Sequence, residues 1–133
     1  MELAKVTRLL VDTDILIDIA NRDETAINRL KAESQQGPLA ISSITVMELI
    51  VGCRNKQEQN QLEDFLAQFQ VIALDGKVST QAIALLKNYC LSHGLLIADA
   101  LIAATAIANN IALLSKNQRD FRFIQELELL AYP

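Results

Sequence analysis

The chain has 133 residues, the length of one compact domain, and its hydrophobic content of 51% excludes an intrinsically disordered protein. Its net charge of −4 at pH 7 excludes a surface that is basic throughout, as it is in many nucleic-acid-binding proteins. We therefore expect a single domain over residues 1–133, in which local Lys and Arg side chains or bound cations would have to hold any polyanionic substrate.

Signals of secretion or of membrane insertion are missing from the sequence. Glu2 precedes any apolar run, which argues against a signal peptide. The longest apolar stretch, residues 95–108, is interrupted by Asp99 and is shorter than the about 20 residues that a membrane helix needs. Cys53 and Cys90 form no CxxC pattern, in keeping with a reducing compartment. We expect a cytoplasmic protein without a membrane segment.

Short apolar runs alternate along the chain with segments whose apolar residues recur at helical spacing. In chain order the pattern predicts a strand at 8–11, followed by helices at 14–20 and 24–34, and then a strand at 39–41, followed by helices from Ser43 or Thr45 to 53 and at 55–69. A third strand at 71–74 precedes helices at 76–92 and 98–109. The chain ends with a strand at 111–114, a turn or short helix at 121–125 and an optional last strand at 128–130. This alternation predicts an α/β fold with a parallel sheet of four to five short strands, covered by helices on both faces.

Four carboxylates lie in or beside segments that otherwise have the composition of a core: Asp12, Glu48, Asp99 and Asp120. A buried carboxylate is costly unless it is paired, hydrogen-bonded or bound to a metal. Asp12 directly follows a predicted strand, and in parallel sheets ligands bind at the carboxyl ends of the strands. Because the ligands would be oxygen atoms without His or Cys, Mg²⁺ or Mn²⁺ is favoured over zinc.

Each acid also has a purely structural interpretation. Asp12 could cap the helix that follows it, and Thr45 to Glu48 fits the capping-box pattern, in which the glutamate returns to the threonine backbone. Asp99 in a first helical turn is favoured by the helix dipole, and Asp120 fits an exposed turn. The position of Asp99 supports a site, because it shares a helical face with the apolar residues 102, 103, 106 and 107.

Four segments resemble the motifs of PIN-domain ribonucleases, in the same order and at similar spacing. They are LVDTDILID at residues 10–18, ISSITVMEL at 41–49, IADALIAATA at 97–106 and LLSKNQRDF at 113–121. The third is the most specific of the four, and the nearest subgroup is the VapC-type toxins of bacterial toxin–antitoxin pairs. The resemblance covers nearly the whole chain and implies a three-layer α/β/α sandwich with a central, mostly parallel sheet.

The resemblance also implies an activity and a cofactor. It implies a Mg²⁺-dependent (or Mn²⁺-dependent) endoribonuclease that cleaves single-stranded or loop RNA with a metal-activated water. It maps the metal-binding acids of the family onto Asp12, Glu48 and Asp99.

The fourth acidic position departs from the family pattern. Many relatives carry an acid where this chain has Asn117, whereas others use the acid before the phenylalanine, here Asp120. We expect Asp120 to be the fourth catalytic carboxylate and Asn117 to be a hydrogen-bonding helper. The other supporting residues are Thr13, which would orient the first acid or the water, and Ser115, where relatives often have Thr.

Basic side chains near the motifs are either phosphate contacts for RNA or ordinary exposed charges: Arg54, Lys56, Lys116 and Arg119. The leucine- and isoleucine-rich helices exceed what one small core needs, so we expect a homodimer face and a groove for a cognate antitoxin protein. Phe65 and Phe69, at helical spacing, are interpreted as core or as part of such a groove.

Two other functions are compatible with parts of the sequence. A catalytically degenerate PIN domain would bind RNA or protein without cutting, and the uncertain fourth acid keeps that alternative open. The run from Val11 to Asp14 also resembles the opening of haloacid-dehalogenase-like phosphatases, in which the first aspartate is a nucleophile. The chain has no Gly-Asp pair for the later acidic motif of those enzymes and is too short for a cap domain, which disfavours a phosphatase.

Overall fold

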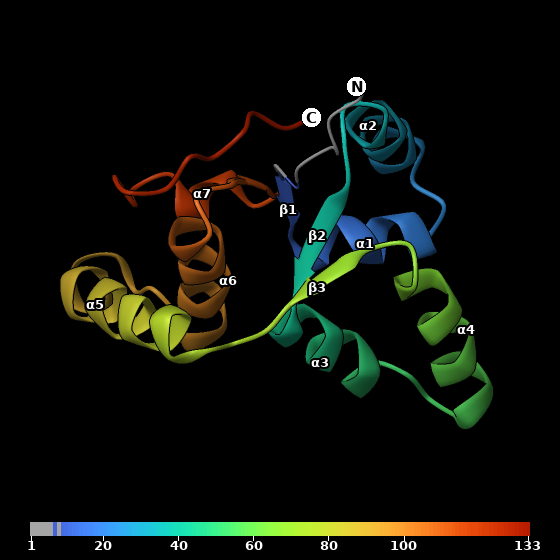
Figure 1. Ribbon diagram of the computed structural model, residues 1–133, viewed down its shortest axis with the longest axis horizontal. Coiled ribbons are helices and arrows are strands. Elements are labelled where there is room, and N and C mark those ends of the chain that lie inside the picture. The colour runs from blue at the N-terminus through green and yellow to red at the C-terminus, as the bar shows by residue number, and fades with distance from the viewer. Residues whose placement is uncertain (1–6, 8) are drawn as a thin grey trace, which may run out of the picture.

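The structure, a computed structural model of the chain, describes residue 7 and residues 9–133, so the predicted start of the first strand at Arg8 lies outside the described residues. Four short strands form one sheet with the order β3-β2-β1-β4 (Figure 1). They are β1 (Leu9–Val11), β2 (Leu39–Ser42), β3 (Gln70–Ile72) and β4 (Ala112–Leu114). Each of the three strand pairings is parallel, which confirms the predicted parallel sheet.

Helices flank the sheet on both sides. Within the described residues they are α1 (Thr13–Ala20), α2 (Glu24–Ser34), α3 (Ser43–Val51), α4 (Lys56–Leu66), α5 (Gly76–His93), α6 (Ile97–Ala108) and α7 (Gln118–Phe121). In Figure 1, α5 and α6 lie to the left of the sheet, whereas α1, α2 and α4 lie to its right. No helix in this part of the chain is long and apolar enough to cross a membrane.

Two hydrophobic cores lie on the two faces of the sheet, because successive strand residues point to opposite sides. Leu10, Ala40 and Leu113 pack with α5 and α6 in one core. The neighbouring strand residues, among them Leu9 and Val11, pack with α1 and α2 in the other. The predicted three-layer α/β/α sandwich is therefore confirmed.

The optional last strand at residues 128–130 is reduced to a single bridge. Leu129 pairs with Leu113 alone, through hydrogen bonds from the Leu113 N–H to the Glu128 carbonyl (2.9 Å) and from the Leu130 N–H to the Leu113 carbonyl (3.0 Å). Side chains take the next carbonyls: Gln118 donates to that of Leu130 at 3.0 Å, and Arg29 donates to that of Ala131 at 2.8 Å. Beyond the single bridge, these carbonyls therefore bond to side chains and not to a neighbouring strand.

Polar residues gather where three of the strands end. Asp12 follows β1, Ser42 ends β2 and Ser115 follows β4, and all three are buried. The Asp12 N–H donates to the Leu114 carbonyl at 2.9 Å, which fixes the ends of β1 and β4 together. On the α5–α6 side, Gly94 ends α5 at a φ of 70°, a left-handed conformation that suits glycine, and α6 begins three residues later.

Candidate active site

Asp12 both caps a helix and lies at the carboxyl end of the sheet. Its Oδ1 accepts a hydrogen bond from the Thr13 N–H at 2.8 Å, and its Oδ2 accepts one from the Ser115 hydroxyl at 2.7 Å. Only 5% of the residue is exposed. Burial, with a further contribution from Asp14, raises the pKa of Asp12 to about 7. The capping interpretation is therefore confirmed, and it does not exclude a place in a site.

The Thr13 side chain connects α1 to α3 through hydrogen bonds. Its hydroxyl donates to Glu48 Oε1 at 2.8 Å and lies 2.9 Å from the hydroxyl of Thr45, which is fully buried. The capping-box interpretation of Thr45 and Glu48 is wrong, because the N-cap of α3 is Ser42, whose Oγ accepts from the Ile44 N–H. Glu48 therefore faces Thr13 and not the start of its own helix.

Asp99 lies in the first turn of α6, where it is half-buried. Burial and then the negative charges of Asp120, Glu48 and Asp14 raise the pKa of Asp99 to about 6. Its carboxylate takes no hydrogen bond or ion pair from any residue that the structure describes. The charge of Asp99 is thus uncompensated by the protein around it.

Asp120 approaches Asp99 from α7. The Asn117 side-chain amide donates to Asp120 Oδ2, as expected for a helper residue. The Asn117 N–H donates to the Ser115 hydroxyl at 3.0 Å, so the segment after β4 is connected to Asp12 through Ser115. The structure therefore brings together Asp12, Thr13, Glu48, Asp99, Ser115, Asn117 and Asp120, the catalytic and supporting residues predicted from the sequence.

Asp14 is a member of this cluster that the sequence analysis left out. Its Oδ2 lies 3.3 Å from the Ser115 hydroxyl, and its Oδ1 accepts from the Lys116 N–H at 3.4 Å. Burial raises the pKa of Asp14, and its charge acts on both Asp12 and Asp99. The spacing Asp12-Thr13-Asp14 directly after a buried strand is the signal that could have identified it. We call Asp12, Asp14, Glu48, Asp99 and Asp120 the acidic site.

The basic side chains near the motifs have other contacts. Arg54 pairs with Glu58 at 2.8 Å, and Lys116 pairs with Asp18 at 3.0 Å. Lys56 Nζ lies 3.4 Å from Gln59 Oε1. A phosphate bound by Arg54 or Lys116 would share the cation with these carboxylates. Arg119 is exposed and forms no ion pair within the described residues, so it is the predicted cation with the most freedom to contact a ligand.

The donor chemistry of the acidic site fits a hard divalent cation. Its ligand atoms are carboxylate oxygens, and none of the five acids forms an ion pair with a Lys or Arg in the part of the chain that the structure describes. The same residues contain no group of three or more His, Cys, Asp or Glu side chains arranged to hold a metal together. Mg²⁺ commonly binds through one or two carboxylates and keeps several waters, and such a mode needs no preformed cage.

Replacing Thr13 with valine is expected to destabilise the fold by about 1–3 kcal/mol. The change keeps the shape of the side chain but leaves the buried Thr45 hydroxyl without its partner and Glu48 without its donor. Thr13→Ser, which keeps the hydroxyl, is the matched control. Urea unfolding checks this expectation, and equal stability of wild type and both variants would contradict it.

Comparison with known proteins identifies the family. The family model of the PIN domain matches residues 9–127. Ribonuclease VapC2 of Rickettsia felis is 34% identical over 127 residues, covering 90% of this chain and 94% of that protein. Ribonuclease VapC10 of Mycobacterium tuberculosis is 32% identical over 121 residues, covering 90% of each.

Solved structures agree with the sequence relatives. VapBC2 of Rickettsia felis, bound to a DNA fragment from its promoter, superposes with a TM-score of 0.81 at 29% identity and covers 96% of this chain and 100% of that one. A toxin–antitoxin complex of Klebsiella pneumoniae has a TM-score of 0.78 at 31% identity, over 92% and 96% of the two chains. The chain therefore belongs to the PIN domain family, and the two sequence relatives described above are VapC ribonucleases.

Proposed function

We propose that this protein is a Mg²⁺-dependent endoribonuclease that cleaves single-stranded or loop RNA, and that it acts as the toxin of a toxin–antitoxin pair. The observation that carries the proposal is the acidic site. Five carboxylates meet at the carboxyl end of a parallel sheet without a compensating cation from the described residues, and the pKa values of Asp12 and Asp99 are raised to about 7 and about 6. The similarity to proteins named ribonucleases supports RNA as the substrate.

Asp12 and Asp99, with Glu48 assisting, are the residues that would hold the ion. When bound, the ion would lower the pKa of water and neutralise charge on the phosphodiester. Thr13 orients Glu48, and Ser115 orients Asp12, so both carboxylates are already positioned before a ligand arrives.

Asp120, held by the Asn117 amide, is the acid that we propose to accept the proton of the attacking water. The water oxygen adds to phosphorus, the bond from phosphorus to the 3′ oxygen breaks, and the 3′ oxygen takes up a proton from solvent, which leaves a 3′-hydroxyl and a 5′-phosphate. A phosphatase of the haloacid-dehalogenase type is disfavoured, because the chain belongs to the PIN domain family.

The nuclease proposal is tested by inducing wild type and Asp12→Ala in cells and mapping new 5′ ends in total RNA. Growth arrest with discrete cuts that the variant lacks would support the proposal. Normal growth and intact RNA with soluble, folded wild type would favour a degenerate PIN domain that binds without cutting.

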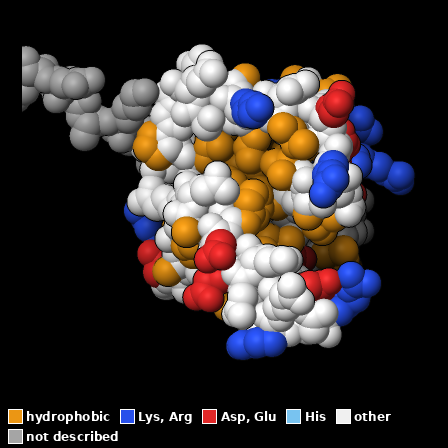
Figure 2. Space-filling view, turned by 90° about the vertical axis from the view of Figure 1, so that its right-hand side faces the viewer, with side chains coloured by type: hydrophobic (Ala, Val, Ile, Leu, Met, Phe, Trp, Pro, Cys, Tyr) orange, Lys and Arg blue, Asp and Glu red, His pale blue; other side chains and the backbone are white. Residues whose placement is uncertain are grey.

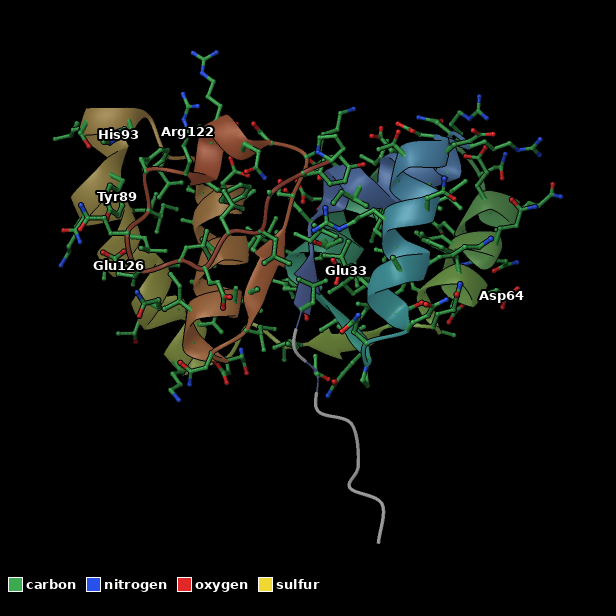
Figure 3. The ribbon with its side chains drawn as sticks, turned by 90° about the horizontal axis from the view of Figure 1, so that it is seen from above. Glu33, Asp64, Tyr89, His93, Arg122 and Glu126 are labelled. Carbon is green, nitrogen blue, oxygen red and sulfur yellow. The ribbon has the colours of Figure 1, made fainter. Side chains whose placement is uncertain are left out.

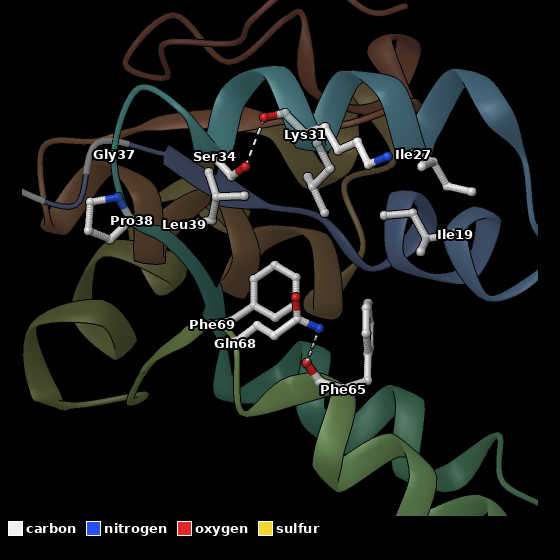
Figure 4. Close-up of a pocket in the computed structure, with 11 residues that line it drawn as sticks. Ile19, Ile27, Lys31, Ser34, Gly37, Pro38, Leu39, Phe65, Gln68 and Phe69 are labelled. Atoms are coloured by element: carbon white, nitrogen blue, oxygen red, sulfur yellow. Dashed lines mark hydrogen bonds between the residues drawn. The ribbon is translucent and has the colours of Figure 1, made fainter.

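An apolar groove between α2 and α4 is our candidate site for the antitoxin. It has a volume of about 460 Å³, and Figure 2 shows hydrophobic side chains gathered in a hollow on this face, with charged side chains around it. In Figure 4, Phe65 and Phe69 face Ile19 and Ile27 across the groove. The α2–α4 groove is lined by Ile19, Ile27, Leu30, Lys31, Ser34, Gly37, Pro38, Leu39, Phe65, Gln68 and Phe69. An amphipathic helix or an extended apolar peptide of the partner fits such a surface.

The α2–α4 groove leads toward the acidic site. Ile19 and Phe65 line both this groove and a second hollow of about 470 Å³, which is also lined by Glu48. A partner segment that filled the groove and continued along the second hollow would reach a carboxylate of the proposed catalytic machinery. Binding of the antitoxin could in this way block access of RNA. The similar structures solved as toxin–antitoxin complexes support a partner of this kind.

Phe65→Ala is expected to weaken binding of the cognate antitoxin at least about tenfold, because it removes an aromatic anchor from the lining of the groove. Asp64→Ala, at an exposed neighbouring position of α4 that does not line the groove, is the matched control. Titration calorimetry measures both affinities, and thermal unfolding checks that both variants are folded. Unchanged affinity of folded Phe65→Ala would place the antitoxin elsewhere.

Self-association is the second assembly that we propose. Met47, Ile50 and Val51 of α3 are 52%, 44% and 84% exposed, which forms an apolar surface outside the core. A two-fold interface through α3 would cover it in a homodimer. Sedimentation equilibrium tests this proposal, and a molecular mass equal to one chain at micromolar concentration would exclude it.

A further inference from the structure

A small cavity opens at the Asp99 and Asp120 end of the acidic site. Its volume is about 110 Å³, and two of the proposed catalytic carboxylates line it. Its aromatic and apolar side comes from the end of α5, the connection between α5 and α6 and the turn after α7. The cavity is lined by His93, Gly94, Leu95, Leu96, Asp99, Asp120 and Phe123.

The aromatic side of the cavity is held in place by several contacts. The His93 ring stacks on that of Phe123, with 4.3 Å between centroids and 11° between planes. His93 Nδ1 lies 2.8 Å from the Ser92 hydroxyl, and the Tyr89 ring meets the His93 ring edge-on at 5.9 Å. Tyr89 donates in turn to Glu126 at 3.1 Å, and Figure 3 shows these side chains at one end of the molecule. His93 is exposed to solvent although its ring is fixed, as expected of a preformed platform for a flat ligand.

The chain entering α6 adds apolar surface beside this platform. Leu96 and Ile97 are 66% and 69% exposed, although they lie within three residues of Asp99. Such exposure does not serve the core, and Leu96 lines the same cavity as Asp99 and Asp120. The combination of a fixed aromatic ring, exposed aliphatic side chains and adjoining carboxylates suits a nucleobase attached to the phosphate that is cut.

We propose that this cavity binds one unpaired nucleobase next to the scissile phosphate, with the base stacked against His93. The inference rests on the proposed nuclease function and deepens it, because it names a subsite for the substrate. His93 is then a substrate-binding residue at the acidic site. Base stacking on an aromatic side chain contributes about 1–3 kcal/mol, which corresponds to about a 5- to 150-fold change in kcat/KM.

The test is a cycle that combines a protein variant with an altered substrate. A short RNA containing a mapped cleavage site is cut by wild type and by His93→Ala, with each nucleotide beside the cut replaced in turn by an abasic one. We expect one abasic position to lower kcat/KM of wild type by about 5- to 150-fold and to have no further effect on His93→Ala. His93→Phe should restore the dependence on the base, and Leu91→Ala, at a residue of α5 that is 98% exposed, is the control.

The subsite would be overturned if the abasic nucleotide lowered kcat/KM of His93→Ala as much as that of wild type. It would also be overturned if His93→Ala had the same kcat/KM as wild type on the unaltered RNA. A purely structural role of the His93–Phe123 stack would lower the unfolding temperature of His93→Ala and leave the effect of the abasic nucleotide unchanged. If wild type with Mg²⁺ cuts no RNA, the nuclease proposal fails separately, and binding of labelled oligoadenylate, followed by fluorescence anisotropy, decides the subsite. Weaker binding by His93→Ala but not by His93→Phe or Leu91→Ala supports it, and equal binding by all four proteins overturns it.

Discussion

Replacing Asp99 with asparagine is expected to abolish RNA cleavage and, at the same time, to stabilise the metal-free protein. The carboxylate is one of the two main ligands in the proposed mechanism, so we expect cleavage to fall by roughly a thousandfold or more. Stability should rise because the pKa of Asp99 is already raised to about 6 by burial and by Asp120, Glu48 and Asp14. Asparagine removes a charge that the fold disfavours while keeping the size of the side chain.

Both effects are measurable on purified protein. Cleavage of a mapped RNA in Mg²⁺ gives the change in activity, and thermal unfolding in EDTA gives the change in stability. Asp64→Asn makes the same chemical change at an exposed position of α4 and should alter neither quantity. An active Asp99→Asn enzyme would remove Asp99 from the proposed machinery. An inactive variant with a lower unfolding temperature would show that the carboxylate supports the fold.

In EDTA, the stability of the protein is expected to fall as the pH rises from about 4 to about 7. The pKa of Asp12 is about 7 in the folded protein against an ordinary aspartate value of 3.8, so in this window the folded state binds more protons than the unfolded state. The free energy of unfolding therefore falls as the pH rises, and above pH 7 the folded protein carries the full cost of a buried, ionised Asp12. For Asp12 the shift corresponds to a cost on the order of 4 kcal/mol. Asp99 acts in the same direction through its pKa of about 6.

Mg²⁺ is expected to reverse this loss at high pH, because the ion binds the deprotonated carboxylates and competes with protons. At a concentration of 100 times its dissociation constant, a ligand that binds only the folded state stabilises it by about 2.7 kcal/mol. Urea unfolding at pH 5 and pH 8, in EDTA and in Mg²⁺, measures the free energy of unfolding under these four conditions. Asp12→Asn should reduce the pH dependence in EDTA to the smaller part that comes from Asp99. A wild-type stability that rises with pH in EDTA would contradict the uncompensated burial of Asp12.

The sequence predicted those features that depend on residues close together in the chain. The helix at 24–34 has the predicted bounds, and α5 ends at His93 before Gly94, because the periodicity and the glycine stop are local signals. The strands differ from their predicted ranges by one or two residues. The end of α4 at Leu66 was predicted at Phe69, since an apolar stripe at helical spacing continues into the segment before β3.

The parts of the site that could not be predicted depend on residues far apart in the chain. The contact of Thr13 with Glu48 spans 35 positions, and that of Ser115 with Asp12 spans 103. A motif can indicate that an acid belongs to a site, but it does not say which hydroxyl orients it. The capping-box interpretation was wrong for the same reason, because the pattern at Thr45 and Glu48 is local and their partner, Thr13, is on another helix.

The helix that forms one wall of the α2–α4 groove has little part in the core. In α4, all of whose residues the structure describes, Leu66 is the one buried residue. The carboxylates, by contrast, are carried by the N-cap of α1 and by α1, α3, α6 and α7, so substitutions on α4 can reshape the groove without moving the acidic site. Evolution can therefore change the partner that such a toxin recognises while its chemistry stays the same. After duplication of a toxin–antitoxin gene pair, the two copies would be able to diverge until each toxin is neutralised only by its own antitoxin.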